Sequence, residues 1–134
     1  MSRRYKPNCG GNLRQTRQGF DRVMATLTSH TLNGTDGTHA GGIKVTLTNL
    51  NSRETIFESY MDDGGRLSQE ISEDKIDTQA TYELVFDVKA YWATQEIHAT
   101  VTQIALRFEM LDPSGLYHMP VVFSPNSYSM WTSA

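Results

Sequence analysis

Polar and apolar residues alternate with a period of two along much of the chain after residue 22. In the segment 43–50, Ile43, Val45 and Leu47 fall on one face and polar residues fall on the other. The segments 81–88 and 104–110 repeat this alternation. A period of two is typical of β-strands that place one face on a core and the other towards water or a partner. The pattern therefore predicts an all-β fold of half-buried antiparallel strands.

Turn-forming residues separate these predicted strands. Residues 49–52 predict a tight hairpin that leads into a strand near 54–61, and glycines mark turns within 33–42 and at 63–65. The Asp-Pro-Ser-Gly sequence at 112–115 is expected to join two antiparallel strands, because proline presets the backbone angle of such a turn. Strands that recur roughly every 10–15 residues predict a two-sheet sandwich. One short helix is predicted near 89–95.

Length and composition limit the class of protein. The chain has 134 residues, enough for one domain with one core. The single cysteine, Cys9, excludes an internal disulfide. The sequence has no apolar run near the roughly 20 residues that span a bilayer, and residues 1–20 do not resemble a signal peptide. We therefore expect a cytoplasmic protein without a membrane partner, with a peroxisomal location as the alternative.

Charge divides the chain into two parts. Residues 1–22 carry six basic residues against Asp21, a net charge of +5, whereas the remainder carries six basic and fourteen acidic residues, a net charge of −8. We interpret residues 1–22 as a disordered extension and residues 23–134 as the domain. A nucleic-acid arm or a targeting segment would also be basic. Because aromatic residues do not interleave with these charges, no nucleic-acid partner is predicted.

Motifs for phosphate binding, a serine nucleophile or zinc do not occur in the sequence. The four histidines are His30, His39, His98 and His118, and no two of them have metal-ligand spacing within one element. No metal site is predicted.

Three stretches carry a resemblance to a known family. LTSHTLN near the start, YELVFDVKAYWATQEI in the middle and YHMPVVFSPNSYS near the end resemble the 5-hydroxyisourate hydrolase and transthyretin family. The similarity runs in the same order from about Ala25 to the C-terminus. It implies a two-sheet sandwich of about eight antiparallel strands with one short helix. It also implies a homotetramer that holds a small molecule at its dimer–dimer interface.

The resemblance assigns a catalytic set to His30, Arg66 and His118. The hydrolases of the family open a cyclic ureide with two histidines and one arginine, and no cofactor is implied. Histidine suits acid–base transfer near neutral pH, and arginine suits a developing oxyanion. Each residue also has a simpler interpretation, namely a satisfied histidine on a strand or a solvated arginine in a turn. His39 and His98 are assigned no function.

The end of the chain departs from the family pattern. The family's H-Y-H is Leu116-Tyr117-His118 here, and its closing Y-R-G-S is Trp131-Thr132-Ser133-Ala134. In the family this end lines the substrate cleft, so the resemblance implies substrate contacts for Tyr117, Trp131 and Thr132. With Met119 and Met130 beside Trp131, the cleft is expected to be less cationic and more apolar than that of a urate-pathway enzyme.

Three functions follow from these observations. The first is a 5-hydroxyisourate hydrolase of urate degradation that cleaves a cyclic amide C–N bond. The second is a related enzyme of specialised metabolism that hydrolyses, opens or isomerises a larger, more apolar ring. The third is a transthyretin-like protein that binds a small molecule without turnover. The retained set of His30, Arg66 and His118 favours the enzymes.

Overall fold

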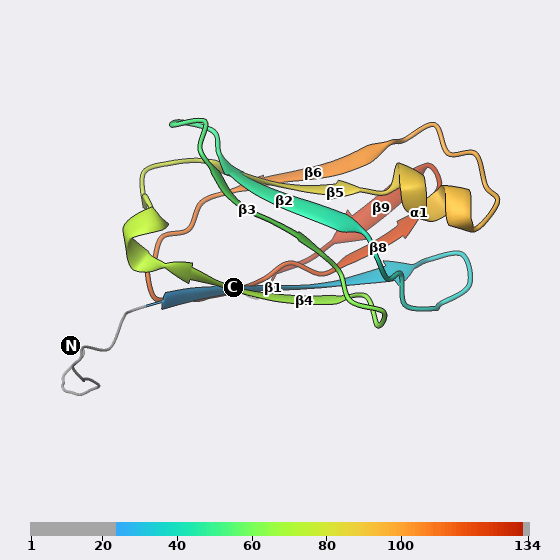
Figure 1. Ribbon diagram of the computed structural model, residues 1–134, viewed down its shortest axis with the longest axis horizontal. Coiled ribbons are helices and arrows are strands. Elements are labelled where there is room, and N and C mark those ends of the chain that lie inside the picture. The colour runs from blue at the N-terminus through green and yellow to red at the C-terminus, as the bar shows by residue number, and fades with distance from the viewer. Residues whose placement is uncertain (1–23, 133–134) are drawn as a thin grey trace.

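A computed structural model describes residues 24–132, and these form a sandwich of two β-sheets (Figure 1). One sheet has the order β4 (Arg66–Ser72), β1 (Met24–Asn33), β8 (Val121–Ser124) and β9 (Ser127–Met130), and β7 (Leu116–His118) also pairs with β1. The other sheet has the order β3 (Thr55–Tyr60), β2 (Lys44–Asn49), β5 (Tyr82–Asp87) and β6 (Gln103–Phe108). The predicted sandwich is confirmed.

Two helical segments complete the described chain. Helix α1 (Lys89–Thr94) confirms the helix predicted near 89–95, and a short 3₁₀ turn, η1 (Glu73–Lys75), follows β4. Helix α1 lies at the end of the sandwich where the loop after β1 turns back (Figure 1). The basic extension predicted at residues 1–22 lies outside the described residues.

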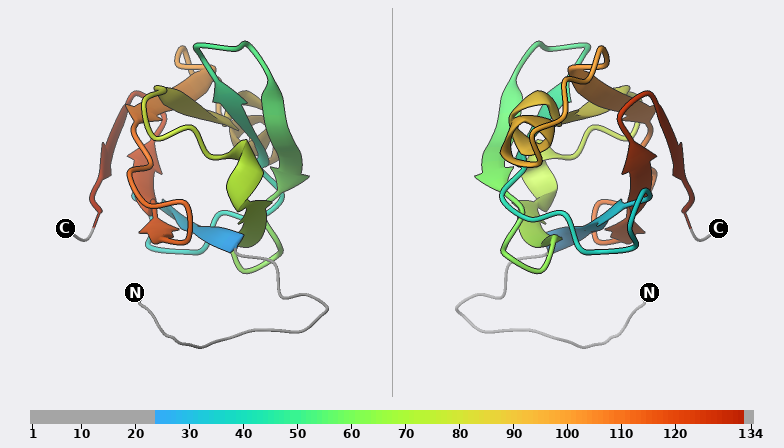
Figure 2. Two further views of the ribbon diagram at one scale, coloured as in Figure 1. Left: turned by 90° about the vertical axis from the view of Figure 1, so that its left-hand side faces the viewer. Right: turned by 90° about the vertical axis from the view of Figure 1, so that its right-hand side faces the viewer.

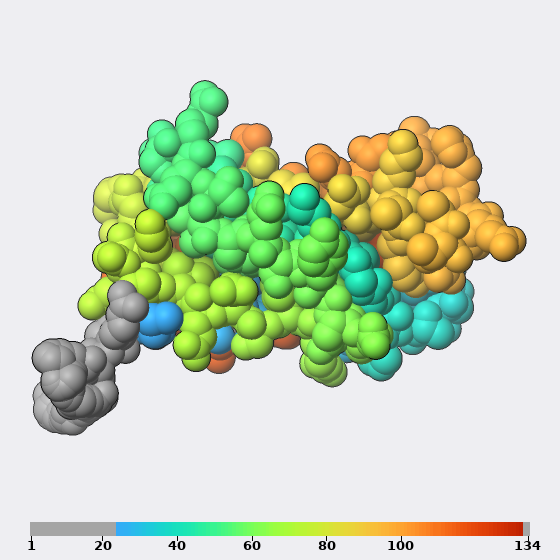
Figure 3. Space-filling view, in the orientation of Figure 1, coloured from blue at the N-terminus to red at the C-terminus, as the bar shows by residue number. Residues whose placement is uncertain are grey.

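The alternation of residues along the strands produces the core. Ile43, Val45 and Leu47 are buried, and the same alternation buries Tyr82, Leu84 and Phe86 on β5. Viewed along the long axis, the two sheets face each other across this core (Figure 2). Side chains fill most of the space between the ribbons (Figure 3). The inner faces therefore supply the stability, and the outer face of the β1 sheet is free to carry polar groups.

An aromatic cluster closes the end of the core beneath α1. Trp92 is fully buried and makes edge-on contacts with Tyr91 and Phe123, at ring-centroid distances of 5.2 and 5.3 Å. The hydroxyl of Tyr91 accepts a hydrogen bond of 3.0 Å from Nδ2 of Asn33, which is buried at the end of β1. The helix is therefore tied to the strand whose outer face carries His30.

The expected hairpin at 112–115 is wrong. The turn is present, but β6 before it pairs with β5, whereas β7 after it pairs with β1 in the other sheet. The chain changes sheets here, and Gly115 accepts a backbone hydrogen bond from Thr26 at 3.0 Å. Turn residues determine a local bend and not which strands pair across it. As a further difference from the expected antiparallel pattern, β7 and β8 both run parallel to β1.

Candidate active site

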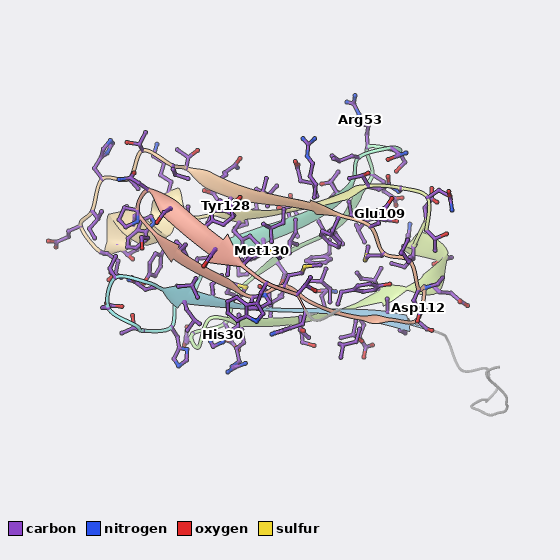
Figure 4. All side chains as sticks on the ribbon, turned by 180° about the vertical axis from the view of Figure 1, so that it is seen from behind. His30, Arg53, Glu109, Asp112, Tyr128 and Met130 are labelled. Atoms are coloured by element: carbon purple, nitrogen blue, oxygen red, sulfur yellow. The ribbon has the colours of Figure 1, made fainter. Side chains whose placement is uncertain are left out.

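His30 lies on the outer face of β1, near the end of its pairing with β4 (Figure 4). Alternate residues of β1 are buried, and His30 belongs to the half-exposed set together with Thr26 and Thr28. His30 and Arg66 are register partners in the antiparallel β1–β4 pair. Because side chains of register partners project on the same side of a sheet, the fold brings these two predicted site residues together.

The turn before Arg66 fixes where that residue enters the sheet. Oδ1 of Asp62 accepts backbone hydrogen bonds from Gly64 and Arg66, both at 2.9 Å. Gly65 has a φ of +73°, a conformation that favours glycine, and its carbonyl accepts a 2.8 Å hydrogen bond from the backbone of Thr31. The two-glycine turn therefore ends with its backbone against β1, one residue before Arg66.

His118 reaches the same face from the other edge of β1. It pairs in parallel register with Thr28, and Nδ1 of His118 lies 2.7 Å from Oγ1 of Thr28 in a hydrogen bond. The backbone of the next residue, Met119, donates to the carbonyl of Thr28 at 2.8 Å. This double attachment orients the imidazole of His118.

An open pocket of about 290 Å³ lies on this face. Its lining comes from β1, the turn before β4, β4 and β7, namely Thr28, Ser29, Asp62, Arg66, Leu67, Ser68 and His118. Two of the three predicted catalytic residues, Arg66 and His118, line it directly, and the third, His30, is the register partner of Arg66. The pocket combines a cation, an imidazole, hydroxyls and a carboxylate, which suits a small polar ligand.

Burial is the main factor that lowers the pKa of His30 below its usual value of 6.5. The charge of Arg66 lowers the pKa further, followed by His39 and then His118. A hydrogen bond with the backbone of Gly64 acts in the opposite direction. The result is a histidine that is neutral at neutral pH and therefore able to accept a proton.

None of the three residues predicted to contact substrate lines this pocket. Tyr117 is the register partner of the buried Leu27, and its hydroxyl donates to the carbonyl of Asp112 at 2.6 Å. Trp131 is 52% exposed, and Thr132 is also exposed beyond the end of β9. Within the described chain, neither Trp131 nor Thr132 lines the pocket.

The expectation that Met119 helps to line an apolar cleft is wrong. Met119 is only 5% exposed and belongs to the core. It follows His118, which pairs with Thr28 on the half-exposed face, and successive residues of an extended chain face opposite sides. Met130 packs against the same core (Figure 4). Trp131 is therefore the exposed apolar residue among the three.

Sequence reasoning missed the partner of His30. The sequence assigns no function to His39, but its Nδ1 lies 2.9 Å from Nε2 of His30. The two rings stack with centroids 5.0 Å apart and an interplanar angle of 26°. Nine residues separate them in sequence, and the loop between them has no periodicity, so no sequence signal indicated this pairing.

Residues 24–132 contain neither a cluster of metal-binding side chains nor a membrane-spanning helix. No group of three or more histidine, cysteine or acidic side chains there is arranged to hold a metal ion. None of the helices in that range is long and apolar enough to cross a membrane.

Together these features define a class of protein: a small two-sheet sandwich with a histidine–arginine face on the strand β1. Comparison with known proteins identifies the family. The model of the HIUase/transthyretin family matches residues 27–132, and the chain belongs to that family.

Several curated relatives bear the name 5-hydroxyisourate hydrolase. The relative from Deinococcus radiodurans is 34% identical over 110 residues, covering 78% of this chain and 92% of its own length. The relative from Pseudomonas aeruginosa is 29% identical over 119 residues, covering 84% of this chain and 94% of its own. The crystal structure of transthyretin from Sparus aurata has a TM-score of 0.72 at 23% identity, covering 80% of this chain and 95% of that one. The fold alone therefore does not separate a 5-hydroxyisourate hydrolase from a transthyretin.

Proposed function

We propose that this protein is a 5-hydroxyisourate hydrolase-like enzyme that opens a cyclic ureide by acid–base catalysis. One observation carries the proposal: His30, Arg66 and His118 meet on one outer face, in a chain that belongs to the HIUase/transthyretin family. The relatives' names support this chemistry through overall similarity, and the geometry supports it through the positions of the three side chains that the family resemblance assigned.

In the proposed reaction, neutral His30 removes a proton from water as the water oxygen bonds to a ring carbonyl carbon. Arg66 stabilises the negative charge that develops on the carbonyl oxygen, because its guanidinium offers several charged donors in a fixed plane. Protonated His118 then donates a proton to the leaving nitrogen as the C–N bond breaks. The lowered pKa of His30 supports its role as the base. The hydrogen bond between Oγ1 of Thr28 and Nδ1 of His118 supports a fixed orientation for His118. These roles use no cofactor.

The complete substrate site is proposed to form between subunits of a homotetramer. The pocket is open on its outer side, and Tyr128 and Trp131 are large exposed residues at or just beyond β9, the edge strand of this sheet. A second subunit packed on this face would cover them and close the pocket. In such an assembly Trp131 and Thr132 would contact the substrate from the rim of the cleft.

A second candidate is a related enzyme that acts on a larger, more apolar cyclic compound. The observation that favours it is the exposed Trp131, followed by Thr132 where the family's pattern has arginine. An indole offers a broad apolar surface in place of a charged donor, so it suits an apolar ring better than a small polar one. The same acid–base set would then serve another hydrolysis, ring opening or isomerisation.

The test is the decay of freshly generated 5-hydroxyisourate, followed by its ultraviolet absorbance. The purified protein should accelerate the decay over buffer. His30→Ala, Arg66→Ala and His118→Ala should each reduce kcat by roughly 10²–10⁴-fold, the range that positioned acid–base groups supply. The control is His98→Ala, since His98 is exposed in the segment after α1.

Each alternative has its own result. No acceleration by the wild-type protein would refute the hydroxyisourate assignment. Full activity in all three site variants would refute the assigned site. Tight binding of an aromatic ligand with no chemical change would favour a transthyretin-like binder.

A further inference from the structure

The loop after β1 places a second imidazole beside His30. Leu32 and His39 form an isolated antiparallel bridge, and two hydrogen bonds flank it: Asn33 donates to the carbonyl of Thr38 at 2.8 Å, and Ala40 donates to the carbonyl of Thr31 at 2.9 Å. The backbone on both sides of His39 is therefore attached to β1. Across such a pair, His39 is the diagonal neighbour of His30, a relation close enough for long side chains to touch.

This segment continues the sheet where β4 begins. Arg66, the first residue of β4, lies opposite His30, and the preceding Gly65 bonds to Thr31. His30 therefore has Arg66 directly opposite on one strand and His39 diagonal to it on the returning loop. The 2.9 Å distance between Nε2 of His30 and Nδ1 of His39 follows from this backbone arrangement.

We propose that His39 is a positioning residue for His30: it fixes the orientation of the His30 imidazole, and the two rings share a proton as one titrating unit. The proposal builds on the catalytic role of His30 given above. It concerns a residue outside the trio that the family resemblance supplies.

The physical basis is the number of protons that the pair can hold. With both rings neutral, one nitrogen donates and the other accepts. With one proton added, the cation donates a charge-assisted hydrogen bond to the neutral ring. With two protons added, two N–H groups and two positive charges would face each other across 2.9 Å. The second proton is therefore taken up only at lower pH, and the two steps belong to the pair.

The other charged groups around His30 either lower its pKa, as His39 does, or form hydrogen bonds elsewhere. Arg66 on β4 and His118 on β7 both lower the pKa of His30. Asp62 is the carboxylate that lines the adjoining pocket, and its Oδ1 accepts backbone hydrogen bonds in the turn before β4. Arg66 and His118 remain in a His39 variant, so a change measured on replacing His39 reports His39 itself.

Two substitutions separate orientation from charge. His39→Asn retains a nitrogen and an oxygen close to the position of Nδ1 but carries no charge, whereas His39→Ala removes both the hydrogen bond and the charge. His98→Ala is the matched control, because it removes an exposed histidine at another position. Each variant is compared with the wild-type protein by histidine NMR titration and by the pH profile of 5-hydroxyisourate decay.

In the wild-type protein the His30 resonances should follow two steps. His39→Asn and His39→Ala should show a single step, at higher pH than the lower wild-type step, and His98→Ala should match the wild type. A general base is active only when it is deprotonated. If His30 takes up its proton at higher pH, the activity also falls at higher pH as the solution is made more acidic, so the acid limb of kcat/KM should move to higher pH in both His39 variants. On the plateau, His39→Ala should lose about tenfold in kcat, the equivalent of one hydrogen bond to an ionisable group, and His39→Asn should lose less.

An unchanged His30 titration in His39→Asn would overturn the shared proton. Equal losses of kcat in His39→Asn and His39→Ala would overturn orientation through Nδ1. If the wild-type protein proves inactive on 5-hydroxyisourate, the proposed function fails, and the NMR titration still decides whether the two rings are coupled.

Discussion

Among the glycines of residues 24–132 that have a positive φ, Gly65 should tolerate replacement least. A Cβ placed on it would lie 2.6 Å from the carbonyl oxygen of Thr31 and 3.0 Å from that of Ala40. Both atoms belong to backbone that is held by hydrogen bonds, so neither can rotate away as a flexible side chain would. The Gly65→Ala substitution must therefore push the start of β4 away from β1.

Three costs add up in Gly65→Ala. Holding alanine at a φ of +73° costs about 1–2 kcal/mol. Forcing a methyl group into filled space costs about 1–3 kcal/mol. Loss of the 2.8 Å bond from Thr31 to Gly65 costs about 1 kcal/mol. The expected loss of unfolding free energy is about 3–6 kcal/mol, a large part of the stability of a small domain.

Gly42→Ala is the matched control. Gly42 also has a positive φ, +76°, but a Cβ there meets no atom within 4 Å. Its alanine variant should lose only the conformational cost of about 1–2 kcal/mol. The measurement is denaturant unfolding of both variants at one protein concentration, because association would add to the apparent stability.

The two variants should differ by about 2 kcal/mol or more, the share that comes from the steric contact and the lost hydrogen bond. Equal losses would show that the close approach of Gly65 to β1 does not constrain the turn. Gly65→Ala should also lower the hydrolysis rate, because Arg66 is the next residue.

Two further substitutions test contacts that hold the site and its support. Thr28→Val removes the hydroxyl bonded to His118 and should lower kcat about tenfold in the absorbance assay, with little change in stability. The control Thr28→Ser keeps a hydroxyl and should retain most of the rate. Equal rates in the two variants would contradict the orienting role of Thr28. Tyr91→Phe leaves Nδ2 of the buried Asn33 without the hydroxyl that it binds and should cost about 1–3 kcal/mol in denaturant unfolding. The control Tyr60→Phe, at an exposed position on β3, should change stability by less than about 0.5 kcal/mol, and a similar loss in both would contradict the argument.

The strands could be predicted because burial follows the period of two. Ile43, Val45 and Leu47 are all buried, and the hairpin after β2 and the helix after β5 also occur where local residues indicate them. The pairing after β6 could not be predicted, since the turn at 112–115 is compatible with a return to the same sheet or a crossing to the other. The crossing depends on long-range contacts, such as the bond from Thr26 to Gly115, that local preferences do not contain.

The candidate site divides in the same way between local and long-range information. His30 and His118 could be assigned to strand faces by pattern, and the family resemblance grouped them with Arg66. The structure places Arg66 opposite His30 and joins His118 to Thr28. His39 lies in a segment without periodicity, and it meets His30 because Thr38 and Ala40 bond back to β1. A non-repetitive loop becomes part of a sheet only through such bonds, so its side-chain partners follow from the folded backbone.

This arrangement links the chemistry of the site to one short stretch of backbone. The inner residues of β1 are buried and the outer ones are half-exposed, so a change at an outer position such as Thr28 should affect rate more than stability. Gly65 is different, because its backbone lies against Thr31 and Ala40. Thr31 is the residue after His30, and Ala40 is the residue after His39. Displacing Gly65 would move Arg66 and the loop that carries His39 together. Orientation of His30 by both neighbours therefore depends on the absence of a side chain at residue 65.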